Sequence, residues 1–208
     1  MPQGRDGLAR LTAALIAAAT LLAMIPPVLG NLDRQGGVLG ALWWLGRFFA
    51  ILTNLAVGVV FARIAWRGWL AASPLVQGGV MLAIMLVGLV FNLLLPGLQH
   101  GTWADYLGDK IHHVIVPLAV PLWWLAFAPH GQLDWRAPLA WALYPLAYAG
   151  YVMTRAKFEP AGTPARYPYF FMDVDKFGWA AAIGNMAAIA LAFVLVGWLA
   201  VWIDRQLG

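Results

Sequence analysis

The stretch FFAILTNLAV, residues 48–57, is an apolar run interrupted by two adjacent polar side chains, Thr53 and Asn54. Hydrophobic residues make up 62% of the 208-residue chain and charged residues only 11%. A soluble domain, in contrast, is about half apolar and about a quarter charged. The composition therefore indicates an integral membrane protein. In lipid, the hydroxyl and the amide of this pair need hydrogen-bond partners elsewhere in the protein.

Apolar runs that can cross the roughly 30 Å hydrocarbon core of a bilayer recur along the chain. They are too long and too uniformly apolar for strands, so the fold class is all-α. We predict a polytopic membrane protein, a bundle of six transmembrane helices that forms a single domain over residues 1–208. The predicted spans are Leu8–Leu29, Leu42–Trp66, Leu75–Leu95, Lys110–Phe127, Pro138–Met153 and Phe177–Ile203.

The first span has one alternative, a signal peptide, because Arg5 and Arg10 precede its apolar core. Its Pro26-Pro27 end offers no small-residue cleavage site, and this favours a retained helix. The Lys and Arg count is nearly even, with six residues on the side of both termini and seven on the other side. The first helix and the short early loops weigh most in setting orientation. We therefore expect a multi-pass protein of the cell membrane with both termini in the cytoplasm.

The net charge of +4 is spread over scattered residues, which gives no support for nucleic-acid binding. The chain has no cysteine, so disulfides and thiolate chemistry are excluded. Monomer and oligomer are not distinguished by the sequence. The expected partners are membrane lipids.

Polar side chains within the predicted spans fall in the outer half of the bilayer. A shared depth on five helices predicts a cavity that faces the outer leaflet, because such groups usually point into a helical bundle. The alternative is helix packing alone, at about 0.6 kcal/mol for each interhelical hydrogen bond. The residues of this layer are Thr53, Asn54, Asn92, His112, His113, Tyr148, Tyr151 and Asn185.

A threonine hydroxyl becomes a nucleophile when a base takes its proton, and histidine is the usual base. His112 and His113 lie within a predicted span and point about 100° apart, so only one of them can face a given partner. Asp109 lies three and four residues earlier; it could orient either imidazole or cap the helix. Asn54 or Asn185 could donate a hydrogen bond to an oxyanion.

Two further interpretations remain open. Asp109, His112 and His113 are also of the right types to bind a metal ion, which would need ligands from loop residues. The loop residues that could contribute are His100, Asp105, Asp173 and Asp175. The segment YPYFFMDVDKFG, residues 167–178, could form a lid through Tyr169 and its aromatic neighbours. It could equally form an interfacial aromatic belt in which Asp173 caps the last helix.

Four motifs together resemble bacterial six-helix membrane proteins related to the androgen-induced-protein family. They are FFAILTNLAVGVVF (48–61), HHVIVP (112–117), LYPLAYAGYVMTR (143–155) and YPYFFMDVDKFGW (167–179), and the resemblance extends over about residues 42–203. The animal members are threonine hydrolases of fatty-acid esters of hydroxy fatty acids. The resemblance implies that Thr53 is the nucleophile and a later histidine the base. A spacing of four residues before Pro117 favours His113, and a spacing of five would select His112.

The leading hypothesis is therefore a lipid ester hydrolase that needs no cofactor and no metal. Thr53 would attack the ester, His113 or His112 would move the proton, and the lipid would enter from the outer leaflet. The alternatives are a non-catalytic protein that binds a lipid or small molecule, and a metal-dependent lipid hydrolase. The candidate substrate-binding residues are Asn54, Asn92, Tyr148, Tyr169 and Asn185.

Overall fold

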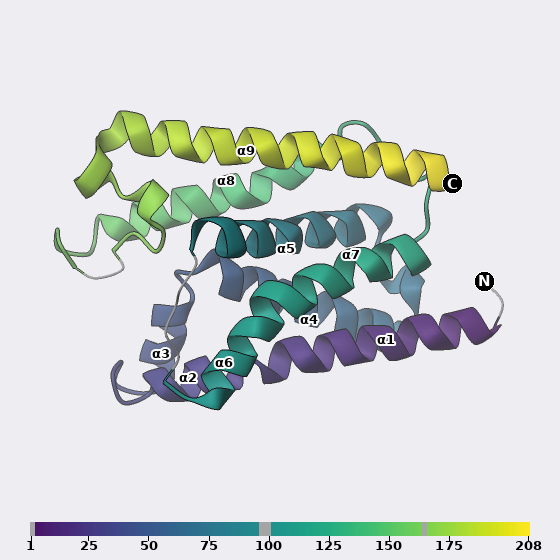
Figure 1. Ribbon diagram of the computed structural model, residues 1–208, viewed down its shortest axis with the longest axis horizontal. Helices are drawn as coiled ribbons and strands as arrows, with labels where there is room; N and C mark the ends of the chain where they lie inside the picture. Colours follow the sequence, from purple (N-terminus) through teal and green to yellow (C-terminus); the bar gives the residue numbers. More distant parts are fainter. Residues whose placement is uncertain (1–2, 96–100, 164–165) are drawn as a thin grey trace. The chain divides into compact units, whose positions relative to one another are not determined.

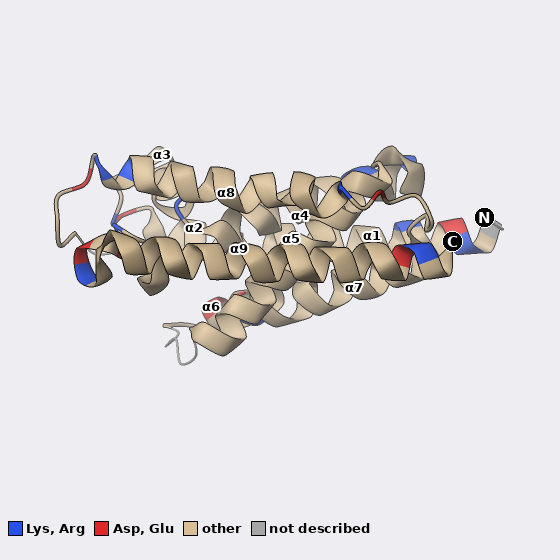
Figure 2. Cartoon of the chain, turned by 90° about the horizontal axis from the view of Figure 1, so that it is seen from above, with Lys and Arg blue, Asp and Glu red and all other residues tan. Residues whose placement is uncertain are grey.

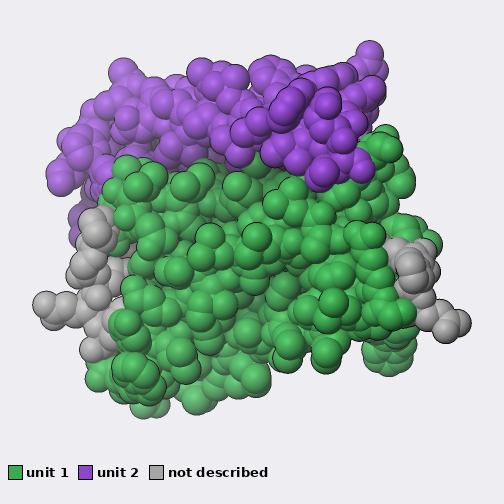
Figure 3. All heavy atoms as spheres, turned by 45° about the vertical axis from the view of Figure 1, so that its right-hand side comes forward, with its two compact units in different colours: residues 1–132, 208 green, residues 133–207 purple. Residues whose placement is uncertain are grey.

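The structure is a computed structural model that describes residues 3–95, 101–163 and 166–208. These residues form helices and no strand, which confirms the all-α class (Figure 1). Contacts divide the chain into two compact units, Met1–Gln132 with Gly208, and Leu133–Leu207 (Figure 3). The longer helices are α1 (Gln3–Leu22), α2 (Ile25–Asn31), α3 (Val38–Leu45), α4 (Phe49–Arg67), α5 (Pro74–Leu94), α6 (Trp103–Lys110), α7 (Val116–Phe127), α8 (Ala137–Ala156) and α9 (Val174–Leu207). Short turns are η1 (Trp69–Ala71), η2 (Ile111–Ile115) and η3 (Phe170–Met172).

Among the described residues, five helices are long and apolar enough to cross a membrane. They are Gly4–Asn31, Phe49–Arg67, Pro74–Leu94, Trp103–Phe127 and Val174–Leu207. The predicted span Pro138–Met153 corresponds to α8, whose 20 residues extend about 30 Å. Tyrosines, prolines and Arg155 make α8 less apolar than the five. The structure thus supports five spans, and the sixth stays a prediction.

Charged residues lie at the ends of the most apolar helices, as expected for segments that cross lipid. In α9, the charged residues lie in the first turn, at Asp175 and Lys176, and in the last turns, at Asp204 and Arg205 (Figure 2). The helix α5 carries no charged residue. This distribution suits a multi-pass membrane protein.

The predicted span Leu42–Trp66 is wrong at its beginning, because the chain turns at residues 46–48 between α3 and α4. Phe48 is extended, with φ −91° and ψ 124°. Buried Arg47 stabilises the turn: its guanidinium stacks over the Trp44 ring at 3.9 Å, and its Nε donates to the Trp44 carbonyl at 3.2 Å. Thr53 therefore lies four residues after the first residue of α4, about 6 Å along the axis, and not within one uninterrupted helix that begins at Leu42.

The segment before the histidines is also helical, although the predicted span begins only at Lys110. A capping box starts α6: Thr102 Oγ1 accepts from Asp105 N at 3.1 Å, and Asp105 Oδ2 accepts from Thr102 N at 3.1 Å. Since α6, η2 and α7 follow without a break, His112 and His113 lie in the interior of a helical segment and not in its first turn. For the same reason Asp109 is not an N-cap.

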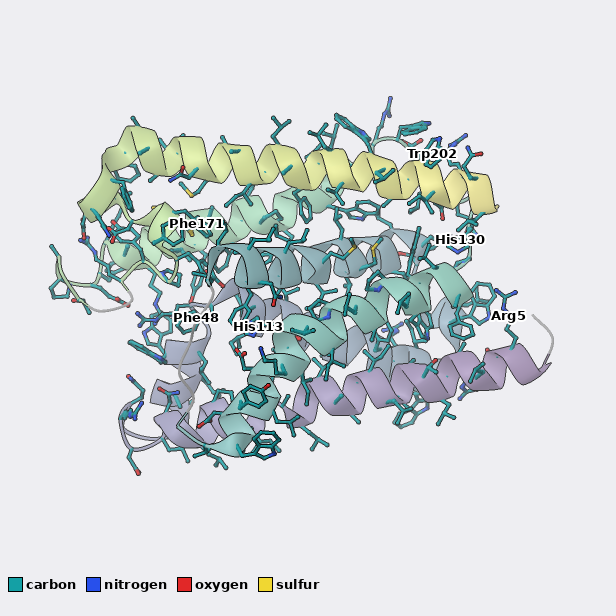
Figure 4. The ribbon with its side chains drawn as sticks, in the orientation of Figure 1. Arg5, Phe48, His113, His130, Phe171 and Trp202 are labelled. Carbon is teal, nitrogen blue, oxygen red and sulfur yellow. The ribbon has the colours of Figure 1, made fainter. Side chains whose placement is uncertain are left out.

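In the first unit, arginines of α1 satisfy carbonyls at the C-terminal ends of α4 and α7. Arg10 donates to the carbonyls of Ala65 at 3.0 Å and Trp66 at 2.5 Å. Arg5 donates to the carbonyl of Ala126 at 2.6 Å (Figure 4). These carbonyls have no partner within their own helices, so the guanidinium groups both pair them and complement the helix dipoles. The contacts join the first helix to two others that follow it in the chain.

In the second unit, α8 packs against α9, and a buried carboxylate holds the segment before α8. Asp204 Oδ2 accepts from the Leu133 backbone N–H at 2.9 Å, and Asp204 is only 1% exposed. At the other end of α9, Asp173 Oδ1 accepts from the Lys176 N–H at 3.0 Å, which confirms the predicted cap. Gly178 bends α9 with a φ of 77°, a conformation that glycine adopts without strain.

Candidate functional site

Polar side chains of the first unit, all buried or half-buried except Asn92, gather around η2, the π-helical turn between α6 and α7, where Figure 4 labels His113. Thr53, Asn54 and His112 are 1%, 0% and 4% exposed. Groups of this kind are costly inside a membrane helix unless protein atoms pair with them. We call the following set the polar cluster: Thr20, Thr53, Asn54, Asn92, Asp109, His112 and His113.

Pro117 explains why the helix forms a π turn at this place. The Val116 N–H donates to the Ile111 carbonyl, five residues earlier, instead of the His112 carbonyl four residues earlier. In π geometry the His112 carbonyl would accept from the N–H of residue 117, but residue 117 is a proline and has no N–H. The same missing N–H removes the α-helical partner of the His113 carbonyl. The turn therefore exposes two carbonyls that need donors from outside the helix.

Two asparagines from neighbouring helices supply those donors. Asn92 Nδ2, on α5, donates to the His113 carbonyl at 2.8 Å and to the Gly88 carbonyl at 2.8 Å. Asn54 Nδ2, on α4, donates to the His112 carbonyl at 3.4 Å and to the Ala50 carbonyl at 2.9 Å. Each amide thus joins a carbonyl of its own helix to one of the π turn.

The contacts of Asn54 also bear on its suggested oxyanion role. Its Nδ2 is committed to two carbonyls, and its buried Oδ1 has no hydrogen-bond partner among the described residues. An amide oxygen accepts hydrogen bonds and would repel an oxyanion. The geometry therefore favours a role for Asn54 in joining α4 to the π turn, the alternative that the sequence also allows.

His112 points towards α1. Its Nε2 lies 3.0 Å from the carbonyl oxygen of Thr20, which can only accept a hydrogen bond, so Nε2 carries the proton. In the neutral ring, Nδ1 then holds the lone pair. The hydroxyl of Thr20 donates to the Ile16 carbonyl at 2.7 Å, so it is the backbone of Thr20 that binds His112.

His113 points back along its own helix. Its Nδ1 lies 3.0 Å from Asp109 Oδ1 and 3.1 Å from the Asp109 carbonyl oxygen, so Nδ1 carries the proton and Nε2 holds the lone pair of the neutral ring. Phe91 of α5 stacks on the imidazole with 3.7 Å between ring centroids and 10° between planes. A carboxylate on one ring nitrogen and a lone pair on the other is the arrangement of a histidine base.

The two imidazoles do not converge on one point. Their centroids are 6.5 Å apart and their planes are 89° from parallel. Among the described residues, no three His, Asp or Glu side chains are placed to hold a metal ion together. His100, one of the suggested ligands, lies outside the described residues. Asp109 and His113 are close, whereas the His112 side chain is directed to Thr20.

Thr53 belongs to the same unit as the two histidines and is almost fully buried on α4. Its neighbour Asn54 bonds to the backbone of His112. The contact between α4 and the π turn is therefore made one residue from the proposed nucleophile and one residue from His113.

Tyr148, Tyr169 and Asn185 belong to the second unit, where they meet around the segment before α9. The rings of Tyr148 and Tyr169 are 6.4 Å apart, and Tyr169 stacks on Phe171 at 5.3 Å with 1° between planes. Asn185 Nδ2 donates to the Phe171 carbonyl at 3.2 Å. We call Tyr148, Tyr169, Phe171 and Asn185 the aromatic cluster. Their role in binding a substrate stays a prediction.

Two partners of the histidines, Thr20 and Phe91, and one close neighbour of Pro117 were not predicted from the sequence. Thr20 acts through its carbonyl oxygen, which every residue has, so its side-chain type carries no signal. Phe91 is one of many aromatic residues in the chain. Gly88 lies so close to Pro117 that an added Cβ would be 2.6 Å from the proline Cβ. A glycine four residues before Asn92 on an apolar helix is a weak signal of such close packing.

The chain was compared with protein-family models, curated proteins and solved structures. No match was found. The resemblance to the androgen-induced-protein family therefore rests on the four sequence motifs alone, and the functional hypothesis rests on these motifs and on the geometry of the polar cluster.

Proposed function

We propose that the protein is a membrane-embedded hydrolase of lipid esters, with Thr53 as the nucleophile and His113 as the base. The observation that carries the proposal is the pair Asp109–His113. The carboxylate holds the proton of Nδ1, so the lone pair of the imidazole is on Nε2. A base oriented in this way can take a proton from a hydroxyl that is otherwise a weak nucleophile.

The reaction would proceed in two steps through an acyl-enzyme. In the first, His113 Nε2 takes the hydroxyl proton of Thr53 while Oγ1 attacks the ester carbonyl carbon; the C–O bond to the alcohol breaks, and the alcohol leaves with that proton. In the second, His113 takes a proton from water, the water oxygen attacks the acyl carbon, and the fatty acid leaves as Thr53 regains its proton. Asp109 stabilises the imidazolium that forms in both steps.

The apolar surface of the neighbouring helices supports a substrate that arrives from the bilayer. Leu55 on α4 and Leu89 and Leu93 on α5 are 45%, 49% and 71% exposed. These side chains lie close in sequence to Thr53, Gly88 and Asn92. An acyl chain in lipid would contact such surfaces without crossing water.

A second candidate is a non-catalytic membrane protein whose polar cluster only holds the helices together or binds a small molecule. One observation favours it: the donor groups of Asn54, Asn92 and His112 are all bound to backbone carbonyls. Interhelical hydrogen bonds of this kind are common glue in membrane proteins.

A fluorophosphonate probe separates the two candidates. The purified protein in lipid nanodiscs should become covalently labelled, and Thr53→Val, which replaces the hydroxyl with a methyl group, should abolish labelling. The matched control is Thr12→Val on α1, where the hydroxyl donates to Leu8 of its own helix at 2.8 Å. Labelling that survives Thr53→Val, or that never occurs, contradicts the hydrolase. Ester hydrolysis that persists in Thr53→Val and stops on chelation would instead indicate a metal-dependent enzyme.

A further inference from the structure

We propose that Asn54 and Asn92 are positioning residues that hold the π turn in one register and thereby set the directions of the His112 and His113 imidazoles. The proposal concerns backbone geometry and does not require that the protein be a hydrolase. Its consequence for catalysis rests on the proposed function.

The first step is the requirement for two external donors. The carbonyls of His112 and His113 face a position where Pro117 supplies no N–H, and an unpaired carbonyl on a membrane helix is strongly unfavourable. Asn54 and Asn92 meet this requirement from α4 and α5, at 3.4 Å and 2.8 Å. Without these amides, an α-helical register would become more favourable, because it pairs the His112 carbonyl with the Val116 N–H and leaves only the His113 carbonyl without a donor.

The second step links the register to the side chains. A π turn contains one more residue than an α turn, so its loss would rotate the residues on one side of it by about 100° relative to those on the other. His112 now reaches the Thr20 carbonyl on α1, and His113 stacks on Phe91 of α5. Both contacts depend on the faces that the π turn presents.

The third step is the close approach of α5. A Cβ on Gly88 would lie 2.6 Å from the Pro117 Cβ and 3.5 Å from the His113 carbonyl oxygen. Only glycine lets the backbone of α5 come this near, and the approach brings Asn92, one turn later, within reach of the His113 carbonyl. The positions of Pro117, Gly88 and Asn92 therefore depend on one another.

A double-mutant cycle between Asn92 and Pro117 tests whether the Asn92 amide replaces the N–H that Pro117 lacks. Asn92→Leu keeps the side-chain size and removes the donor, whereas Pro117→Ala returns the missing N–H. The readouts, in nanodiscs, are the thermal midpoint and the 15N spectra of the histidine rings, assigned by substituting each histidine. Wild-type protein should show a proton on Nε2 of His112 and on Nδ1 of His113.

Asn92→Leu should change the His113 ring signals and lower the midpoint by several degrees. In the Pro117→Ala background the same change should shift the midpoint much less, because the N–H of residue 117 can then donate to the His113 carbonyl in α-helical geometry. Asn92→Gln, which keeps a donor, should retain part of the wild-type signals. Asn185→Leu removes an equivalent amide–carbonyl bond in the second unit and should leave the His113 signals unchanged.

Equal effects of Asn92→Leu in both backgrounds, including loss of folding in both, would overturn the proposal, as would His113 signals that Asn92→Leu does not alter. Loss of folding that Pro117→Ala rescues would support it. If the protein is a hydrolase, Asn92→Leu should also slow fluorophosphonate labelling, by up to about 100-fold. Ring signals that change as expected without any labelling would uphold the positioning role and reject the hydrolase.

Discussion

The polar cluster of the first unit and the aromatic cluster of the second contain the same kind of hydrogen bond, but it has a different structural role in each. In each, an asparagine amide donates to a backbone carbonyl, Asn92 to His113 at 2.8 Å and Asn185 to Phe171 at 3.2 Å. The carbonyl of Phe171 belongs to the short turn η3 before α9, where irregular backbone needs side-chain donors in any case. The carbonyl of His113 belongs to a helix interior, and it needs a donor because Pro117 follows four residues later. Asn185 therefore holds an irregular segment in place, whereas Asn92 makes an irregularity inside a helix possible.

The two regions also differ in what the hydrogen bond controls. The segment that Asn185 holds contributes aromatic rings, whose contacts are broad and tolerant of small shifts. The turn that Asn54 and Asn92 hold carries two imidazoles, whose chemistry depends on which nitrogen has the proton. Changes around the π turn in the first unit should therefore affect reactivity as well as stability, whereas changes in the second unit should affect stability alone.

The largest effect is expected from Asp109→Asn. The neutral amide no longer stabilises an imidazolium at His113, and it can turn its own donors towards Nδ1. The rate of probe labelling or ester hydrolysis should fall about 10²–10⁴-fold. The matched control is Asp105→Asn in the same helix, where an amide oxygen can still accept from Thr102. Similar rates for the two variants would remove Asp109 from the proposed mechanism.

Next comes Arg155→Met in the second unit. Arg155 is buried; it pairs with Glu159 at 3.3 Å and donates to the Tyr151 hydroxyl at 2.9 Å. Its loss leaves the Glu159 carboxylate largely buried without this cation, so the unfolding free energy should fall by about 3 kcal/mol. Denaturant titration in micelles measures this, with exposed Lys157→Met as the control. A change below about 1 kcal/mol would mean that the pair is worth no more than one at the surface.

A smaller loss is expected from Gly88→Ala, because the new methyl group collides with Pro117. Overpacking of this kind costs about 1–3 kcal/mol. Gly184→Ala on α9 is the matched control, since a Cβ there meets nothing within 4 Å. The control should be neutral or slightly stabilising because alanine favours helix. Thermal midpoints of the two variants give the comparison, and equal midpoints would contradict the close approach of α5 to Pro117.

The smallest effect is expected from Asn185→Leu, which removes one amide–carbonyl bond at an exposed position. The expected loss is about 0.6 kcal/mol, the average for such bonds between membrane helices. Chemical denaturation measures it alongside Asn92→Leu. If Asn185→Leu costs as much as Asn92→Leu, the contrast between the two regions fails.

Helices were predictable because long apolar runs in lipid must pair all their backbone groups internally. The boundaries of the helices were less predictable. The break at residues 46–48 depends on Arg47 folding onto Trp44, and the start of α6 depends on a capping box in a stretch rich in polar residues. Both errors moved candidate residues along the helix axis: Thr53 lies nearer a helix start than expected, and the histidines lie farther from one.

The site was predictable in its residue types and only partly in their contacts. The sequence indicates that Asp109 shares a helix face with both histidines, since three and four residues both make about one turn. The structure selects His113, because the π turn directs His112 to α1.

By itself the sequence determines that this chain is helical, apolar and interrupted by a few polar side chains that need partners. It also contains Pro117, so the carbonyl of His113 had to lack its usual donor in an α-helix. Only the tertiary structure decides which side chains donate to the carbonyls of the π turn. Asn54 and Asn92 lie on other helices, and no sequence periodicity connects them to Pro117. The missing N–H of Pro117 is encoded within one helical turn. The donors that replace it depend on the packing of that turn against α4 and α5.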